Sequence, residues 1–254
     1  MTDKEEKKVF FGSKKMSQKD MEDNVNSVFD SVAKKYDLMN NLMSFGMHKL
    51  WKSKAVDFLY LNQVKDNGLI IDIASGTCDL GQIIKSREKG RLNLICSDKN
   101  QNMLTIGRNK MIDKGLILNT AFSCFDVLNI PLIDNSVDRV ITAFGLRNFS
   151  DKSKALAEIF RILQPGGKCV ILEFSRINEK KFSKIYELYS KNIIPILGEI
   201  VVADKESYEY LISSIENHPD QDSVVMLMEK TGFFRPSFYN IFSGLITIHW
   251  GYKT

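Results

Sequence analysis

The stretch Gly68-Leu-Ile-Ile-Asp-Ile-Ala-Ser-Gly-Thr-Cys-Asp79 places an acidic residue near the end of an apolar run, then a turn of small residues and a second acidic residue. This order is typical of the first strand, turn and helix of a nucleoside-binding α/β sheet. The next apolar run, 92–97, leads into Asp98, which comes 22 residues after Gly76. That is about the spacing at which such folds place a carboxylate on ribose hydroxyls, so the sequence predicts a nucleoside cofactor.

The turn contains too few glycines for a dinucleotide. A pyrophosphate-binding turn needs three glycines at fixed positions so that the backbone can approach the phosphates, whereas this turn has only Gly76. An uncharged ribose and an amino-acid tail fit it better, which indicates S-adenosylmethionine. We expect Asp98 to accept hydrogen bonds from both ribose hydroxyls, because an ionised carboxylate only accepts. The turn with Gly76 and Thr77 would hold the methionyl part, Asp126 would accept from the adenine amino group, and the Val127 N–H would face the ring.

A carboxylate after a strand also has a purely structural interpretation, because Asp is a good N-cap for a following helix. For Asp79, directly before Leu80, we favour the cap. For Asp126 both interpretations stay open. For Asp98 the joint occurrence with the Gly76 turn favours the cofactor.

Strand-like and helix-like segments alternate through the middle of the chain. Expected strands cover 69–74, 92–97, 119–125, 137–144 and 168–174, and expected helices cover 79–87, 102–113 and 152–163. Such alternation implies right-handed crossovers and a mostly parallel sheet. Two further strand-like runs, 237–241 and 245–250, predict a closing antiparallel hairpin at the sheet edge.

We predict one domain over residues 21–254. A chain of 254 residues, 44% of them hydrophobic, can bury one large core. We expect lead-in helices over 21–61, a cofactor-binding core over 68–175 and a substrate-side insertion over 179–230 with helices at 180–189, 207–216 and 223–230. Residues 1–20 form a lysine-rich arm, interpreted as solvated and disordered or, alternatively, as attracted to an anionic membrane surface.

Composition argues against several other classes of protein. A net charge of +4 is too mild for a nucleic-acid-binding protein. The four cysteines lack C-x-x-C spacing and are interpreted as buried, reduced thiols of a cytosolic protein. No cluster has metal-ligand spacing, and no apolar run approaches the roughly 18 residues that a membrane-spanning helix needs. We therefore expect a cytoplasmic protein without a metal.

Several longer motifs are shared with a known family. They are Val28-Phe-Asp-Ser-Val-Ala-Lys-Lys-Tyr-Asp-Leu-Met-Asn, Phe144-Gly-Leu-Arg-Asn-Phe-Ser-Asp, Gln164-Pro-Gly-Gly, Leu172-Glu-Phe-Ser, Tyr208-Glu-Tyr-Leu-Ile-Ser-Ser-Ile, His218-Pro-Asp-Gln-Asp and His249-Trp-Gly-Tyr-Lys. With them the chain resembles the UbiE/MenG family of quinone-pathway C-methyltransferases over nearly its whole length beyond the arm. The Gly-Leu-Arg-Asn and His-Pro-Asp-Gln-Asp stretches are the most specific.

The resemblance implies a class I S-adenosylmethionine-dependent methyltransferase fold, Rossmann-like, with a mostly parallel seven-stranded sheet and a C-terminal antiparallel hairpin. It also implies C-methylation of a polyprenyl quinol, a benzoquinol or a demethylmenaquinol or both, in ubiquinone or menaquinone biosynthesis. The family's cofactor contacts fall on Thr77, Asp98, Asp126 and Val127 of this chain.

The chain departs from the family pattern at three positions near the cofactor. Ser75 and Cys78 stand where glycines are typical, and Ala143 stands where many members have a serine that contacts the cofactor. Losing that side-chain hydrogen bond costs roughly 0.5–1.5 kcal/mol. We expect weaker cofactor binding at these points, without its loss.

The acceptor chemistry directs attention to the residues after strand 137–144. A quinol ring carbon is far more nucleophilic once the neighbouring hydroxyl, with a pKa of about 10, has lost its proton. We expect Arg147 to supply a fixed charge for the developing phenolate, and Asn148 and Tyr36 to orient it. The proton acceptor stays open between a water molecule, Asp151 and Asp220.

Structural interpretations compete for some of these side chains. Arg147 can pair with Asp151 at i+4. His218 can act as a base or end a helix, whereas His48 and His249 are expected at the surface or in packing. The sequence leaves these alternatives open.

The lipid substrate places a further demand on the chain. The apolar stretch 191–203 is either ordinary core or a wall of the polyprenyl groove that reaches the membrane interface. We expect peripheral visits to the inner face of the membrane, compatible with a homo-oligomer or a quinone-pathway complex. The alternative functions are a class I methyltransferase for another small molecule or for RNA, and a non-catalytic nucleoside-binding subunit.

Overall fold

The computed structural model describes residues 8–11, 14–17, 44, 46–175, 213–215 and 217–254. Tyr36, most of the expected lead-in helices, the expected helix 180–189, most of the expected helix 207–216 and the apolar stretch 191–203 lie outside these ranges. The expected cofactor-binding core, 68–175, lies entirely within them.

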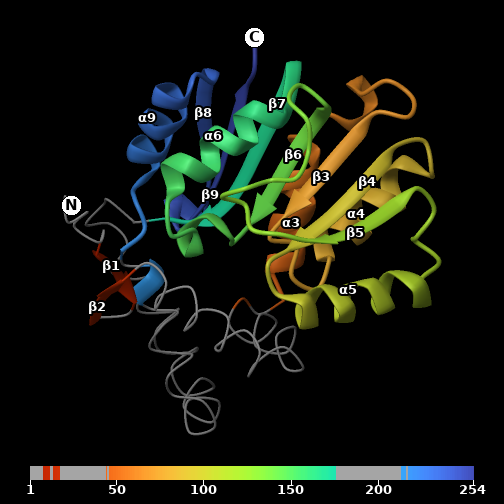
Figure 1. Cartoon of the computed structure of the whole chain (residues 1–254), viewed down its shortest axis with the longest axis horizontal. Helices are drawn as coiled ribbons and strands as arrows, with labels where there is room; N and C mark the ends of the chain where they lie inside the picture. The colour runs from red at the N-terminus through yellow and green to blue at the C-terminus, as the bar shows by residue number, and fades with distance from the viewer. Residues whose placement is uncertain (1–7, 12–13, 18–43, 45, 176–212, 216) are drawn as a thin grey trace, which may run out of the picture.

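One seven-stranded sheet forms the centre of the molecule (Figure 1). Its strands are β3 (Leu69–Ile73), β4 (Asn93–Asp98), β5 (Thr120–Cys124), β6 (Val137–Ala143), β7 (Leu163–Phe174), β8 (Phe234–Ile241) and β9 (Ile246–Tyr252). They lie in the order β5-β4-β3-β6-β7-β9-β8. The first five are parallel, while β9 runs antiparallel to both of its neighbours, β7 and β8. The predicted parallel sheet with a closing hairpin is confirmed.

Helices cover both faces of the sheet. Successive apolar side chains of a strand point to opposite faces, so both faces must be buried. Ile70 of β3 packs in one cluster with α3 (His48–Asp57), α4 (Asp79–Glu88) and α5 (Gln101–Asp113). Ile71 and Ile73 pack in a second cluster with α6 (Lys152–Ile162) and α9 (Gln221–Thr231). Figure 1 shows α6 and α9 in front of the sheet and α3 behind it. The turns η1 (Leu61–Gln63), η2 (Leu146–Asn148) and η4 (Phe242–Gly244) are short 3-10 helices.

The predicted N-cap at Asp79 is wrong. Asp79 is the first residue of α4, and Cys78 occupies the cap position without a capping side chain. The Asp79 carboxylate instead accepts from the Lys52 ammonium at 2.7 Å, which ties α3 to the start of α4. Lys52, together with hydrogen bonding, holds the pKa of Asp79 below its usual value although burial opposes this.

Two segments contain more strand than the sequence predicted. β7 begins at Leu163 and includes the Gln164-Pro-Gly-Gly stretch, because Gly166 and Gly167 exchange hydrogen bonds with Lys253 next to the end of β9. In the lysine-rich arm, β1 (Lys8–Phe11) and β2 (Lys14–Ser17) form a two-stranded antiparallel sheet where we expected no regular structure.

Lys168 lies buried at the start of the β7 segment that pairs with β9. Its ammonium is 4.0 Å from the ring centre of Tyr60 and 5.0 Å from that of Tyr252, with Trp250 and Phe58 just under 6 Å away. Among the described residues no hydrogen-bond acceptor reaches it. Burial, with a smaller contribution from Arg139, lowers the pKa of Lys168 to about 8.

All four cysteines are free, and Cys78, Cys96 and Cys169 are buried as predicted, whereas Cys124 is exposed. Of the helices in the described ranges, none is both long and apolar enough to cross a bilayer.

Candidate active site

A cavity opens at the carboxyl ends of the parallel strands, where open α/β sheets bind ligands. Its wall combines the turn after β3, the end of β4, the loop after β5 and the turn after β6. Six of the residues singled out from the sequence line it: Gly76, Asp98, Asp126, Val127, Ala143 and Asn148. The alternation of strands and helices therefore brings side chains that are far apart in sequence to one place.

Asp98 is fixed by the backbone around it. One carboxylate oxygen accepts the Gly76 N–H at 2.7 Å, and the other accepts the Asn100 N–H at 2.8 Å. A carboxylate offers about four acceptor positions, so these backbone donors do not exhaust its capacity to accept from a ribose hydroxyl. Burial raises the pKa of Asp98, although hydrogen bonds from the backbone of Asn100, Gly76 and Lys99 lower it in part. The group fits the expected ribose contact.

The cofactor turn accommodates its two departures from the family pattern through local contacts. Cys78 has a left-handed backbone (φ 59°), which explains why glycine is typical at this position. Its Sγ lies 3.7 Å from the Ser75 hydroxyl and packs against α5 at Gly107. A Cβ at Gly107 would be only 2.4 Å from that sulfur, so α5 leaves room for the thiol. Thr77 is buried within the turn and is not part of the described cavity wall.

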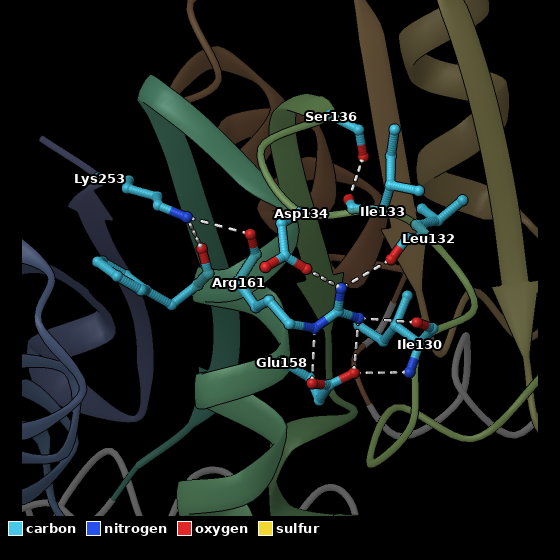
Figure 2. Close-up of polar contacts among 9 residues, drawn as sticks. Ile130, Leu132, Ile133, Asp134, Ser136, Glu158, Arg161 and Lys253 are labelled. Carbon is cyan, nitrogen blue, oxygen red and sulfur yellow. Dashed lines mark hydrogen bonds and ion pairs between the residues drawn. The ribbon is translucent and has the colours of Figure 1, made fainter.

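Asp126 stands in a loop that Arg161 holds from α6. The carboxylate accepts from Lys99 at 2.8 Å and from the Leu128 N–H at 2.9 Å. The ion pair with Lys99 is partly exposed, so an adenine amino group can replace it at small cost. Figure 2 shows the Arg161 guanidinium bonded to the carbonyls of Ile130 and Leu132, to Asp134 and to Glu158. The loop that carries Asp126 is thereby fixed.

The cavity fits S-adenosylmethionine in its apolar surface as well. Met103, Val127, Leu128 and Phe149 offer apolar surface for an adenine ring in the same cavity wall as Asp126 and Asp98. Residues 74–78 provide only small side chains next to these groups, which leaves space for a methionyl tail.

The comparison with known proteins agrees with this geometry. A model of the ubiE/COQ5 methyltransferase family matches residues 15–253. The chain belongs to this family. The ubiquinone/menaquinone biosynthesis C-methyltransferases UbiE of Idiomarina loihiensis and Methylococcus capsulatus are 40% and 41% identical to it, over 100% of both chains in the first case and over 98% and 99% in the second. The chain is thus an S-adenosylmethionine-dependent methyltransferase.

Solved structures agree on the fold. An S-adenosylmethionine-dependent methyltransferase from Aquifex aeolicus superposes with a TM-score of 0.61 at 17% identity, over 88% of this chain and 98% of the other. A phosphoethanolamine N-methyltransferase of Haemonchus contortus in complex with S-adenosyl-L-methionine gives 0.57 at 14% identity, over 79% and 52%. The class I methyltransferase fold inferred from the family resemblance is confirmed.

Asn148 and Arg147 follow β6 in the turn η2, and they differ in their surroundings. Asn148 lines the cavity and donates to the Phe144 carbonyl at 3.5 Å. Arg147 is not part of the described cavity wall. Its side chain is 8% exposed and forms a salt bridge with Glu173, 2.6 Å long. Asp151, which we weighed as its partner, accepts from the Lys154 N–H and caps α6.

The other titratable groups considered as candidates have structural partners. Asp220 caps α9 by accepting the Ser223 N–H. His218, His48 and His249 are all buried. His48 and His249, which we expected either at the surface or in packing, are therefore packing residues. Burial lowers the pKa of His249 to about 4, so this imidazole is neutral at physiological pH.

Sequence reasoning gave no role to Glu173, Lys99 or Phe144. Phe144 lines the cavity with a left-handed backbone (φ 60°), and strain of this kind gathers at functional sites. Glu173 belongs to the Leu172-Glu-Phe-Ser motif, which was one signal of the family, but the motif by itself carries no role for the carboxylate.

Proposed function

We propose that this methyltransferase transfers a methyl group to a ring carbon of a polyprenyl quinol, a benzoquinol or a demethylmenaquinol or both, in ubiquinone or menaquinone biosynthesis. The observation that carries the proposal is the family match, which runs through both the cofactor turn and the Gly145–Asn148 turn. Relatives that are about 40% identical over whole chains carry the name of this activity.

An aromatic cluster supports an aromatic acceptor. The ring of Phe144, in the cavity wall, lies 4.9 Å from that of Phe174 and 6.5 Å from that of Trp51, which in turn lies 6.0 Å from Phe242. Aromatic rings at these distances provide faces and edges on which a further ring can stack. We infer that the quinol ring packs against Phe144.

The chemistry asks the chain to favour the quinol in its deprotonated form. Bound S-adenosylmethionine supplies the methyl group from its sulfonium. Asn148 is proposed to orient the acceptor oxygen and Arg147 to stabilise its developing negative charge, with Tyr36 as a third proposed contact outside the described residues. Because Asp151 and Asp220 act as helix caps, we favour a water molecule as the first proton acceptor.

The polyprenyl tail implies work at a membrane surface, and we propose peripheral binding to the inner face. The lysine-rich arm supports this, since each lysine near anionic headgroups contributes about 1 kcal/mol. Cosedimentation with vesicles that contain anionic lipid should pull down the protein at low salt, whereas neutral vesicles should not. Binding that ignores both salt and lipid charge would contradict the electrostatic part.

The proposed activity is tested by incubating the protein with methyl-labelled S-adenosylmethionine and either a reduced demethylmenaquinone or a reduced polyprenyl benzoquinone. We expect label on the ring carbon of at least one product, identified by mass spectrometry. The oxidised quinones serve as controls, because they lack the activating hydroxyl. Cofactor binding without methylation of either quinol would overturn the proposal and leave another acceptor.

A further inference from the structure

Glu173 accepts two hydrogen bonds from one residue, Arg147, in the turn after β6. It ends the buried part of β7 and has no exposed surface. One oxygen accepts from the Arg147 guanidinium at 2.6 Å and from the Phe174 N–H at 2.9 Å. The other oxygen accepts the Arg147 backbone N–H at 3.1 Å. One carboxylate therefore sets both the backbone and the side chain of Arg147.

The position of this turn decides what the cavity presents to an acceptor. Phe144, Gly145 and Asn148, from the same turn, line the cavity. The Arg147 guanidinium lies 5.8 Å from the ring centre of Phe144 and 5.5 Å from that of Phe174. A shift of the guanidinium would therefore also disturb these two aromatic rings. If the carboxylate lost its charge, the guanidinium would be left without its buried counter-charge, and such a group rearranges.

The charges around Glu173 come from several elements. Lys152 of α6 donates to the carbonyls of Arg147 and Phe149, each at 3.3 Å, and is electrostatically coupled to Glu173. His249 of β9 also senses Glu173, and it is neutral at physiological pH. The carboxylate thus balances cationic groups from both η2 and α6.

We propose that Glu173 is a positioning residue for methyl transfer, which acts through Arg147 by fixing the guanidinium and with it the 144–148 turn, whose residues Phe144, Gly145 and Asn148 line the cavity. This inference rests on the proposed quinol reaction. A guanidinium that is fixed before the reaction stabilises a developing phenolate without reorganising. Because this gain appears only as charge develops, the residue should affect turnover more than binding.

The test compares five proteins: wild type, E173Q, E173D, R147A and R147A/E173Q. Wild type, E173Q, R147A and R147A/E173Q form a double-mutant cycle. We expect E173Q to lower kcat for quinol methylation at least tenfold, while the KM for quinol and the Kd for S-adenosylmethionine change less than threefold. E173D, which keeps the charge, should recover part of kcat. R147A/E173Q should be no slower than R147A, because Glu173 acts through Arg147.

A matched control is E88Q. Glu88 is also buried, pairs with Lys85 and accepts a backbone N–H, from Leu92, yet it lies outside the cavity wall. E88Q should lower the melting temperature and leave kcat within twofold. If E173Q does not fold, R147A is compared with R147A/E173Q, because neither variant buries an unpaired guanidinium. Equal kcat in the two supports the inference, and a slower double variant contradicts it.

Two results would overturn the inference. E173Q could keep kcat within twofold of wild type, or E173Q could slow R147A by the same factor as it slows wild type. A wild-type protein that methylates neither quinol would instead overturn the proposed function. In that case hydrogen exchange at the Arg147 amide tests directly whether Glu173 holds the turn: lost protection in E173Q supports the inference, and unchanged protection contradicts it.

Discussion

Asp98 is the residue on which the cofactor side of the cavity depends, and its contacts make a sharp prediction. Both oxygens already accept backbone N–H groups, so Asp98→Asn turns an amide NH2 towards one of those donors. We expect Asp98→Asn and Asp98→Ala each to weaken S-adenosylmethionine binding at least tenfold, about 1.4 kcal/mol. Calorimetry measures this. Asp113→Asn, an exposed change at the end of α5, is the control and should leave affinity unchanged.

At the same scale, the structure explains which residues sequence reasoning could find. Gly76, Asp98, Asp126, Val127 and Asn148 all lie at or after the ends of strands, and strand ends can be recognised from local patterns. Their individual roles stay predictions. The partners that the sequence missed are different in kind. Glu173 pairs with Arg147, 26 positions away. Asp79, expected to cap α4, instead pairs with Lys52, 27 positions away. No local pattern encodes such pairs.

Among the elements, α5 and the cofactor turn are packed too closely for any added atom. A Cβ at Gly107 would lie 2.4 Å from the Cys78 sulfur and 2.8 Å from the Thr77 carbonyl carbon. Gly107→Ala should therefore push α5 from the turn, at a cost of about 1–3 kcal/mol, and weaken S-adenosylmethionine binding severalfold. Thermal unfolding and calorimetry measure both effects. Asn109→Ala, exposed on the same helix, should change neither; equal behaviour of the two variants would contradict the close contact.

The loop after β5 depends on α6 in a comparable way. Arg161 reaches the Ile130 and Leu132 carbonyls with a planar fork that lysine cannot reproduce. Arg161→Lys should loosen the loop that carries Asp126 and weaken cofactor binding, with faster hydrogen exchange over 126–132. Asp134→Asn removes only a largely exposed partner and should have little effect. Unchanged exchange in Arg161→Lys would show that the loop is held by other contacts.

Element boundaries were predicted well where hydrophobic period and caps agree. The expected helix at 152–163 is observed as α6, Lys152–Ile162, with Asp151 as its cap. Between the helix and the expected strand 168–174 no strand was expected, but β7 already begins at Leu163, because Lys253 extends the pairing at Gly166 and Gly167. That contact forms only in the folded protein, so local sequence signals for a turn could not reveal it.

For the molecule as a whole, buried Lys168 makes stability depend on alkaline pH. Its pKa is about 8 in the folded protein and about 10.4 in an unfolded chain. Between these values the unfolded chain binds more protons, so this group makes the free energy of unfolding rise with pH. Below pH 8 the ammonium is charged in both states, and its burial cost is fully present, offset in part by the four aromatic rings.

Lys168→Met should accordingly raise the melting temperature at pH 7, by about 2–4 °C if the net cost is on the order of 1 kcal/mol. The gain should shrink as pH rises towards 10, where wild type buries a neutral amine. Thermal unfolding across this range measures it, with exposed Lys65→Met as control. A gain that is independent of pH would mean that Lys168 keeps its ordinary pKa.

The Cys78 thiol also provides a chemical probe of how often the cofactor turn opens. A thiol-alkylating reagent should modify exposed Cys124 at once, and Cys78 only during moments when the turn separates from Gly107. Saturating S-adenosylmethionine should slow the modification of Cys78, because a ligand that binds the closed form makes openings rarer. Cys169, in the core on the other side of the sheet, reports global unfolding and serves as the internal reference. Equal modification rates for Cys78 and Cys169 would mean that the turn opens only with the whole protein, and a faster rate for Cys78 would measure how often the turn opens by itself.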